Sequence, residues 1–138
     1  MNDKHIITVL GEQVGVLVSS KSTRNSFFVG VQASPPGGGP PPHVHDREDE
    51  LFTVLEGEYD LFDGQQWTPF RKSEYQHKRR GELHTFRNCG STTGKVLFVA
   101  TPGGLDEYFE FISPLTLPQD MARLLEISQM FGITFAAH

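Results

Sequence analysis

Cysteine, long apolar runs and net positive charge are all scarce in this sequence. Cys89 is the only cysteine among 138 residues, so no disulfide can form within the chain, which is typical of a reducing compartment such as the cytoplasm. The lone thiol is expected to be buried or at an edge rather than to act as a nucleophile. The apolar part of residues 1–10 is too short for a signal peptide, and no apolar run approaches the ~20 residues of a membrane span. We therefore expect a cytoplasmic protein with no membrane partner.

The charge balance also narrows the class of partner. A net charge of −5 argues against nucleic acid, and the one sizeable basic cluster, residues 71–80, is interrupted by Glu74. Hydrophobic content of 37% and eleven phenylalanines are ordinary for a globular fold with an aromatic interior. At this length we expect one domain over residues 1–138 with a core of its own.

Glycine and proline are abundant instead, with 14 and nine copies, which suits the many tight turns of an all-β barrel. The barrel core is expected over residues 6–101, and Asp63-Gly64 is a strong hairpin signal within it. Short β-branched or aromatic runs predict its strands. They lie at residues 6–10, 14–19, 26–33, 50–62, 65–70, 84–88 and 95–101.

The strand at residues 26–33 has two dissimilar faces. Phe27, Val29 and Val31 share one face, which is apolar enough to be core, while the opposite face carries Gly30 and Gln32. The pattern alone leaves open which of these faces the inside of the barrel.

Helical periodicity replaces the strand pattern after Pro102-Gly103-Gly104. Apolar residues at 105, 108, 109 and 112 predict an amphipathic helix, and a second helix is expected from a capping box at Thr116 to Gly132. These two short helices, at about residues 104–132, are expected to cover a barrel opening or to form a dimer contact. Tyr108, Phe109 and Phe111 either pack in the core or border a ligand pocket.

A loop rich in glycine and proline, residues 34–42, delivers two histidines one residue apart. His43 and His45 can point the same way on a strand and hold one small ion. Glu50 lies an odd number of residues from His45, so residues 46–49 must bend to bring its carboxylate to the same side. Imidazole and carboxylate together suit first-row transition metals.

A second segment about forty residues on supplies a further imidazole. Gly81 forms a turn before His84, which starts an alternating strand with Phe86 and Asn88 on one face. Asn88 is expected to orient this strand by a hydrogen bond rather than to touch a substrate.

Together the two segments resemble the cupin superfamily, in particular single-domain, quercetinase-like members. Gly37, His43, His45, Glu50 and Gly57 follow its pattern G-x5-H-x-H-x4-E-x6-G, and Gly81, His84 and Asn88 follow the later G-x2-H-x3-N. The resemblance covers roughly residues 25–115. It implies a small jelly-roll barrel, all-β with two C-terminal helices, and a metal held by His43, His45, Glu50 and His84. It also implies a homodimer, which we expect to contact through the N-terminal strands or the C-terminal helices.

The second segment departs from the family pattern. Arg79 replaces the usual proline, Lys72-Ser73-Glu74 replaces the usual Ala-Gly-Asp turn, and the normally apolar strand between them is polar at residues 75–78. We expect this face to be exposed or to line a pocket for an anionic ligand.

Three imidazoles and one carboxylate leave open positions on a divalent ion, as a catalytic site requires. Ligand type allows iron, manganese, nickel, cobalt, copper or zinc. The resemblance favours a dioxygenase-type oxidoreductase acting on a small cyclic or enolisable molecule. A barrel that only binds a small molecule or sugar, and a non-redox isomerase or cyclase, remain alternatives.

Carboxylates near the motif have separate expected roles. Glu50 can act as a general base if it leaves the metal. Asp46, Glu48 and Asp49 are expected to form a solvated turn, and Glu48 has the best claim among them as an alternate ligand.

Overall fold

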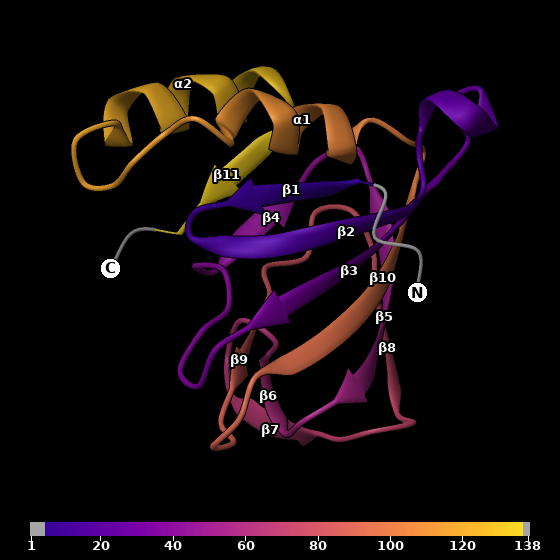
Figure 1. Ribbon diagram of the computed structural model, residues 1–138, viewed down its shortest axis with the longest axis vertical. Coiled ribbons are helices and arrows are strands. Elements are labelled where there is room, and N and C mark those ends of the chain that lie inside the picture. The colour runs from indigo at the N-terminus through magenta and orange to yellow at the C-terminus, as the bar shows by residue number, and fades with distance from the viewer. Residues whose placement is uncertain (1–4, 137–138) are drawn as a thin grey trace.

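The computed structural model describes residues 5–136, so the ends of the expected domain, at residues 1–4 and 137–138, lie outside the described part. Strands predominate, and two α-helices follow them near the C-terminus (Figure 1). The strands are β1 (Ile6–Val9), β2 (Glu12–Val18), β3 (Phe28–Ser34), β4 (His43–His45), β5 (Asp49–Glu56), β6 (Tyr59–Phe62), β7 (Trp67–Phe70), β8 (Tyr75–Lys78), β9 (Thr85–Asn88), β10 (Gly94–Thr101) and β11 (Ile133–Phe135).

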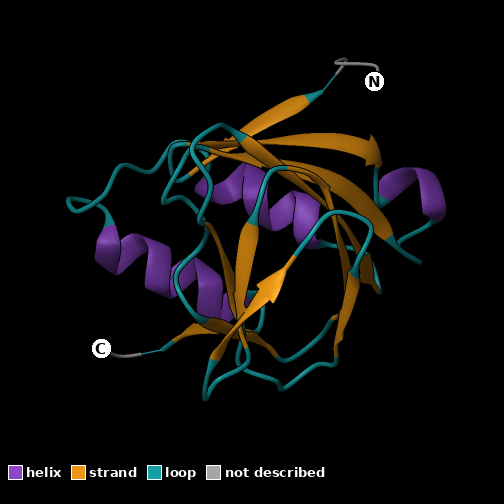
Figure 2. Ribbon diagram, turned by 90° about the horizontal axis from the view of Figure 1, so that it is seen from below, coloured by secondary structure: helices purple, strands orange, loops and turns teal. Residues whose placement is uncertain are grey.

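These strands form three sheets, and every strand pair is antiparallel. A six-stranded sheet has the order β1-β2-β3-β10-β5-β8, a three-stranded sheet has the order β7-β6-β9, and β11 pairs with β4. Figure 2, turned by 90° so that the molecule is seen from below, shows the curved strands together with the two helices. The expected jelly-roll architecture is therefore confirmed, and the Asp63-Gly64 hairpin joins β6 to β7 as expected.

The inside of the barrel is aromatic. Phe28, Phe52 and Phe98 are each at most 3% exposed, and the Phe98 ring contacts the Phe28 ring edge-on at a centroid distance of 5.5 Å. Phe28, Gly30 and Gln32 point inward from β3, which answers the question that the sequence pattern left open, and Phe27 on the opposite face is 36% exposed. Gly30 belongs inside because a side chain there would press against the Phe28 and Phe98 rings.

The two helices close one end of the barrel. Helix α1 (Leu105–Ile112) and helix α2 (Met121–Met130) lie beside β1 and β11 at the upper end in Figure 1. The predicted positions of both helices are confirmed, except that residues 117–120 form turns and α2 begins only at Met121. Sequence reasoning missed β11, which follows α2. Within the described residues, no helix is long and apolar enough to cross a membrane.

Gly39 holds the loop that leads to β4 against β9. Its φ is +143°, and a Cβ there would lie 2.0 Å from the Phe86 carbonyl oxygen. Gly37 also has a positive φ, +81°, but faces open space. We expect Gly39→Ala to lower the free energy of unfolding by about 1–3 kcal/mol more than Gly37→Ala, because only the first adds a backbone clash to the conformational strain. Denaturant unfolding of both variants measures this, and equal losses would refute the close packing of Gly39.

Candidate metal centre

Strand β4 places two imidazoles on one face. His43 and His45 are buried, with Val44 between them only partly so. The strand is held on both sides: β11 pairs with it, setting Ile133 opposite His45, and His84 exchanges two backbone hydrogen bonds of 3.0 Å with His43. The predicted common direction of the two histidines follows from this pairing.

Glu50 reaches the same point from β5. Residues 46–48 form a bend after β4, and β5 begins at Asp49, so Glu50 returns to the histidine side as predicted. Its carboxylate oxygen Oε1 lies 3.2 Å from His45 Nε2 and 3.4 Å from His84 Nε2. His84 stands just before β9, next to His43 across the isolated bridge.

The structure thus brings the four predicted residues together. One nitrogen or oxygen from each lies within 4.8 Å of the others, and all four residues are buried. Glu50 Oε1 and His84 Nε2 are fully buried without a hydrogen-bond partner. Buried polar atoms normally have a partner, so these two fit a missing ligand between them. Three imidazoles and a carboxylate are also a donor set that transition metals accept, and the cluster can therefore hold a metal ion. Its residues are His43, His45, Glu50 and His84.

The protonation states of two of these groups suit a cation. Burial, reinforced by the neighbouring imidazoles, lowers the pKa of His43 to about 3, so its ring is neutral at pH 7. Burial alone would raise the pKa of Glu50, but the charge of His45 and its histidine neighbours outweighs it and lowers this pKa to about 2. A neutral imidazole and an ionised carboxylate are the forms that bind metal.

Each imidazole is oriented through its other nitrogen. His43 Nδ1 lies 2.8 Å from the Pro41 carbonyl oxygen, and His84 Nδ1 lies 3.2 Å from the Glu82 carbonyl oxygen. A carbonyl only accepts, so both rings carry their proton on Nδ1, which leaves the Nε2 lone pairs facing the centre. Partners of this kind fix the direction and basicity of metal-binding histidines.

The partner of His45 is an acid. Glu48 Oε1 lies 3.2 Å from His45 Nδ1, and the Glu48 side chain is only 5% exposed. The expectation of a solvated turn was therefore wrong for Glu48, although Asp46 is exposed and Asp49 pairs with Arg80 at the surface. Glu48 contacts the outer nitrogen of the ring, and it is not one of the four clustered residues.

The environment of His45 also raises its pKa. Burial lowers the pKa of this imidazole, but the Glu50 charge and the hydrogen bond to Glu48 outweigh burial, and the net shift is upward from 6.5. Without a metal, a proton on His45 is thus stabilised by two carboxylates.

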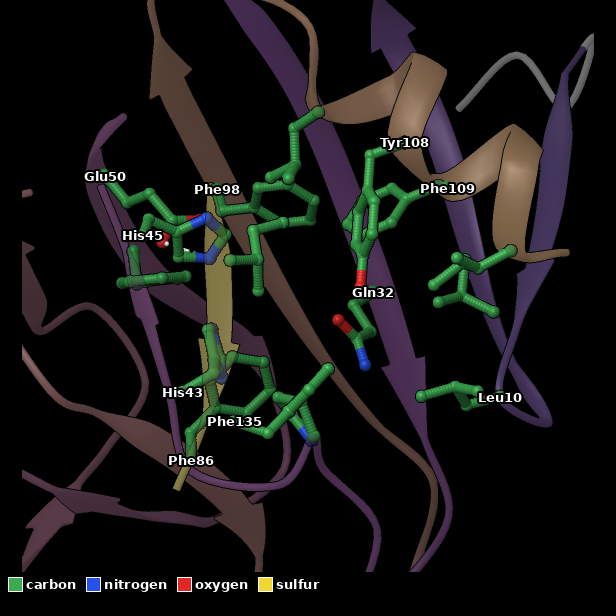
Figure 3. Close-up of a pocket in the computed structure, with 16 residues that line it drawn as sticks. Leu10, Gln32, His43, His45, Glu50, Phe86, Phe98, Tyr108, Phe109 and Phe135 are labelled. Atoms are coloured by element: carbon green, nitrogen blue, oxygen red, sulfur yellow. Dashed lines mark ion pairs between the residues drawn. The ribbon is translucent and has the colours of Figure 1, made fainter. Parts of the chain in front are cut away.

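The cluster opens onto a cavity inside the barrel (Figure 3). The cavity is narrow, since only about 70 Å³ of it admits the centre of a water molecule. Of the three aromatic residues expected to pack in the core or border a pocket, Tyr108 and Phe109 line it from α1, whereas Phe111 is 54% exposed. Hydrocarbon and aromatic side chains dominate the lining: Val9, Leu10, Pro40, Phe52, Phe86, Phe98, Leu105, Phe109, Ile112, Ile133 and Phe135.

The polar second segment lies away from this cavity. Strand β8 is the outermost strand of the large sheet, its Tyr75 is 73% exposed, and no residue of the strand lines the cavity. We expected this segment either to be exposed or to line a pocket for an anionic ligand, and the structure shows that it is exposed. Asn88 orients its strand as predicted, donating to the Ser34 and Thr92 carbonyls. Cys89 is exposed just after β9.

Comparisons with solved structures agree with this architecture. The chain is 25% identical to a predicted oxalate decarboxylase from Thermotoga maritima, with a TM-score of 0.63 over 66% of this chain and 80% of that one. A sugar phosphate isomerase from Silicibacter pomeroyi is also 25% identical, with a TM-score of 0.59 over 66% of this chain and 59% of that one. An uncharacterized protein with a double-stranded β-helix domain from Klebsiella pneumoniae matches over all of this chain and 90% of its own, at 17% identity and a TM-score of 0.62.

A search of curated proteins gave no match. The family comparison, by contrast, matches residues 30–100 to the Cupin domain, a stretch that contains all four clustered residues and the strands that carry them. Motif, barrel and family match agree, and the chain belongs to the cupin family.

Proposed function

We propose that this cupin is a metal-dependent oxidoreductase of the dioxygenase type that acts on a small cyclic or enolisable molecule. In this proposal His43, His45, Glu50 and His84 hold one divalent transition ion. Such an ion keeps one or two open positions and, if redox-active, activates a bound substrate or dioxygen. The observation that carries the proposal is that His43, His45 and Glu50 line the cavity, so a substrate in the cavity would reach an ion held by these residues.

The cavity walls favour an apolar ring over a sugar. Aromatic side chains surround the space next to the cluster, with Phe52 contacting the His84 ring at a centroid distance of 5.5 Å. Burial of an apolar ring against such walls is favourable, whereas the hydroxyl groups of a sugar would lose their water without partners.

Glu50 is the group that would accept a proton from the substrate. It is the only acidic side chain lining the cavity, and its low pKa keeps it ionised at neutral pH. A carboxylate beside a bound cation is a weak base, so the substrate group must itself be acidic. An enol or phenol bound to a cation meets this condition.

Oxygen consumption tests the proposal. The apoprotein would be loaded in turn with Fe²⁺, Mn²⁺, Ni²⁺, Co²⁺, Cu²⁺ and Zn²⁺ and screened against phenols and enols. We expect oxygen uptake with at least one redox-active ion and none with zinc. Binding without any turnover would instead support a barrel that only holds a small molecule.

An isomerase or cyclase that uses the metal only as a Lewis acid is the second candidate. It is favoured by the 25% identity to a sugar phosphate isomerase, although no lysine or arginine lines this cavity to receive a phosphate. Anaerobic turnover by the zinc-loaded protein would select this candidate over the oxidoreductase.

We also propose a homodimer that contacts through the outer face of the six-stranded sheet, which includes β1 and β2, the N-terminal strands predicted as one of two contacts. The strand registers align Tyr75, Thr53, Leu97, Val31, Gly15 and Ile6 in one row across that face. Leu51, in the next row, is 43% exposed. Leu51→Glu is expected to convert a dimer to a monomer, because a charge would be buried at the contact.

Light scattering after size exclusion measures this change, with Leu125→Glu as the matched control. Leu125 is 47% exposed on α2, the other predicted contact. Loss of the dimer in the Leu125 variant alone would move the contact to the helices, and a monomeric wild-type protein would contradict the proposal.

A further inference from the structure

One amide faces the cavity from β3, opposite the side that bears the histidines. Gln32 lines the cavity, and in Figure 3 it lies near Tyr108, away from His43 and His45. It is the only amide side chain among the residues that line the cavity. Sequence reasoning placed Gln32 on the polar face of its strand without assigning it a role, so its function is open to interpretation from the structure.

The half-buried carboxylate of Glu12 fixes which end of this amide points inward. Gln32 Nε2 donates to Glu12 Oε1 at 2.9 Å, and the same carboxylate accepts from Ser34 Oγ at 2.6 Å and from the Gly39 backbone at 2.9 Å. An ionised carboxylate only accepts, so the NH₂ group of Gln32 must face Glu12. Its carbonyl oxygen Oε1 has no hydrogen bond within the described residues, and it remains as an acceptor for a ligand.

The Tyr108 hydroxyl, which faces the cavity near Gln32, is also left as a hydrogen-bond acceptor for a ligand. The Tyr108 hydroxyl lies 2.7 Å from Ser128 Oγ, and Ser128 Oγ in turn donates to the Leu124 carbonyl at 2.6 Å. Serine has one hydroxyl proton, so Tyr108 must donate its own proton to Ser128. Only lone pairs of the Tyr108 oxygen remain for another molecule.

The cavity therefore offers acceptors but no spare donor away from the cluster. Its lining contains no lysine, arginine, asparagine, serine or threonine, and its other side chains there are hydrocarbon or aromatic. A second carboxylate or phosphate on a ligand would be buried without a partner, which is costly. A hydroxyl or N–H group would instead meet the Gln32 oxygen.

We propose that the ligand is an uncharged aromatic or cyclic molecule with two polar ends. One end supplies an oxygen to the metal, and the other carries a hydrogen-bond donor that binds the Gln32 carbonyl oxygen. This deepens the proposed function and rests on it. The proposal excludes a ligand with two anionic groups, because only the cluster end of the cavity would attract an anion. Glu12 acts as a positioning residue that keeps the amide in the acceptor orientation.

Three para-substituted benzenes test this proposal on the zinc-loaded protein, where no redox chemistry intervenes. Hydroquinone carries two hydroxyls, 4-methoxyphenol carries a hydroxyl and a methyl ether, and terephthalate carries a carboxylate at each end. Resorcinol and 3-methoxyphenol repeat the first comparison with the groups closer together. Titration calorimetry is expected to show at least one diol binding about five- to tenfold more tightly than its ether, and terephthalate most weakly.

Gln32→Leu is expected to bring diol and ether to equal affinity, while Gln76→Leu, a matched change on β8 outside the cavity, leaves the preference intact. The wild-type comparison stands even if the Gln32 variant does not fold. Equal binding of both diols and their ethers, no binding of any phenol, or tightest binding of terephthalate would overturn the proposal while zinc loading still supports the metal site. Failure to load zinc or any of the other five ions would overturn the proposed function as well.

Discussion

A His43→Ala/His84→Ala variant is expected to lose its metal, from about one ion per chain to about none. The two residues supply half of the clustered ligand atoms, and their removal leaves only His45 and Glu50. Two ligands do not hold a divalent ion against water and buffer at micromolar concentration. Elemental analysis after purification and after incubation with each candidate ion measures the loss.

His77→Ala is the matched control for this variant. His77 lies on β8 with an exposed side chain and is expected to leave the metal content unchanged. Thermal unfolding gives a second measurement: an ion at a thousandfold excess over its Kd adds about 4 kcal/mol of stability, which raises Tm by roughly 10–20 °C in a domain of this size. If the wild-type protein and the double variant had the same metal content and the same rise in Tm, the assignment of the metal site would be wrong.

Glu48→Gln is expected to weaken metal binding by about 10–100-fold at pH 8, although Glu48 does not touch the ion. The carboxylate beside His45 Nδ1 raises the basicity of the ring and fixes its direction. Chelator competition measures the affinity. Asp46→Asn removes a neighbouring charge without a hydrogen bond to the ring, so a much smaller effect is expected. Equal effects of the two variants would assign the result to charge alone.

The pH dependence gives a further check on Glu48. Because the pKa of His45 is raised above 6.5, an ion must displace a proton from His45 as the pH falls toward that value, and wild-type affinity declines. Removing Glu48 lowers this pKa, so proton competition begins at a lower pH in Glu48→Gln. The affinity gap between wild type and variant is therefore widest at pH 8 and narrows toward pH 6. A gap that widens toward pH 6 would contradict this role.

The ligand cluster could be predicted because its spacing is local. His43 and His45 share a face on any strand, and one bend returns Glu50 to it, so the geometry follows from a few residues. His84 required the family resemblance, since no rule of periodicity brings a residue about forty positions away to the same point. The C-terminal helices followed equally directly from helical periodicity.

The surroundings of the cluster depend on long-range packing that periodicity does not encode. The outer face of β3 is the more apolar one, yet Gln32 faces inward, because Glu12 on the neighbouring strand satisfies its amide. Glu48 is buried in a run of charges that looks solvated, because the bend after β4 turns its carboxylate back onto the His45 ring three residues earlier. Strand β11 is three residues long, too short for an alternating pattern to signal.

X-ray absorption by the metal-loaded protein tests the central claim most directly, because it counts the ligands around the ion itself. We predict three imidazoles and at least one oxygen ligand, with one imidazole fewer in His84→Ala if that variant still binds the ion. A spectrum with one imidazole or none, or a protein that takes up no ion at all, would contradict the assignment of His43, His45, Glu50 and His84 as a metal centre.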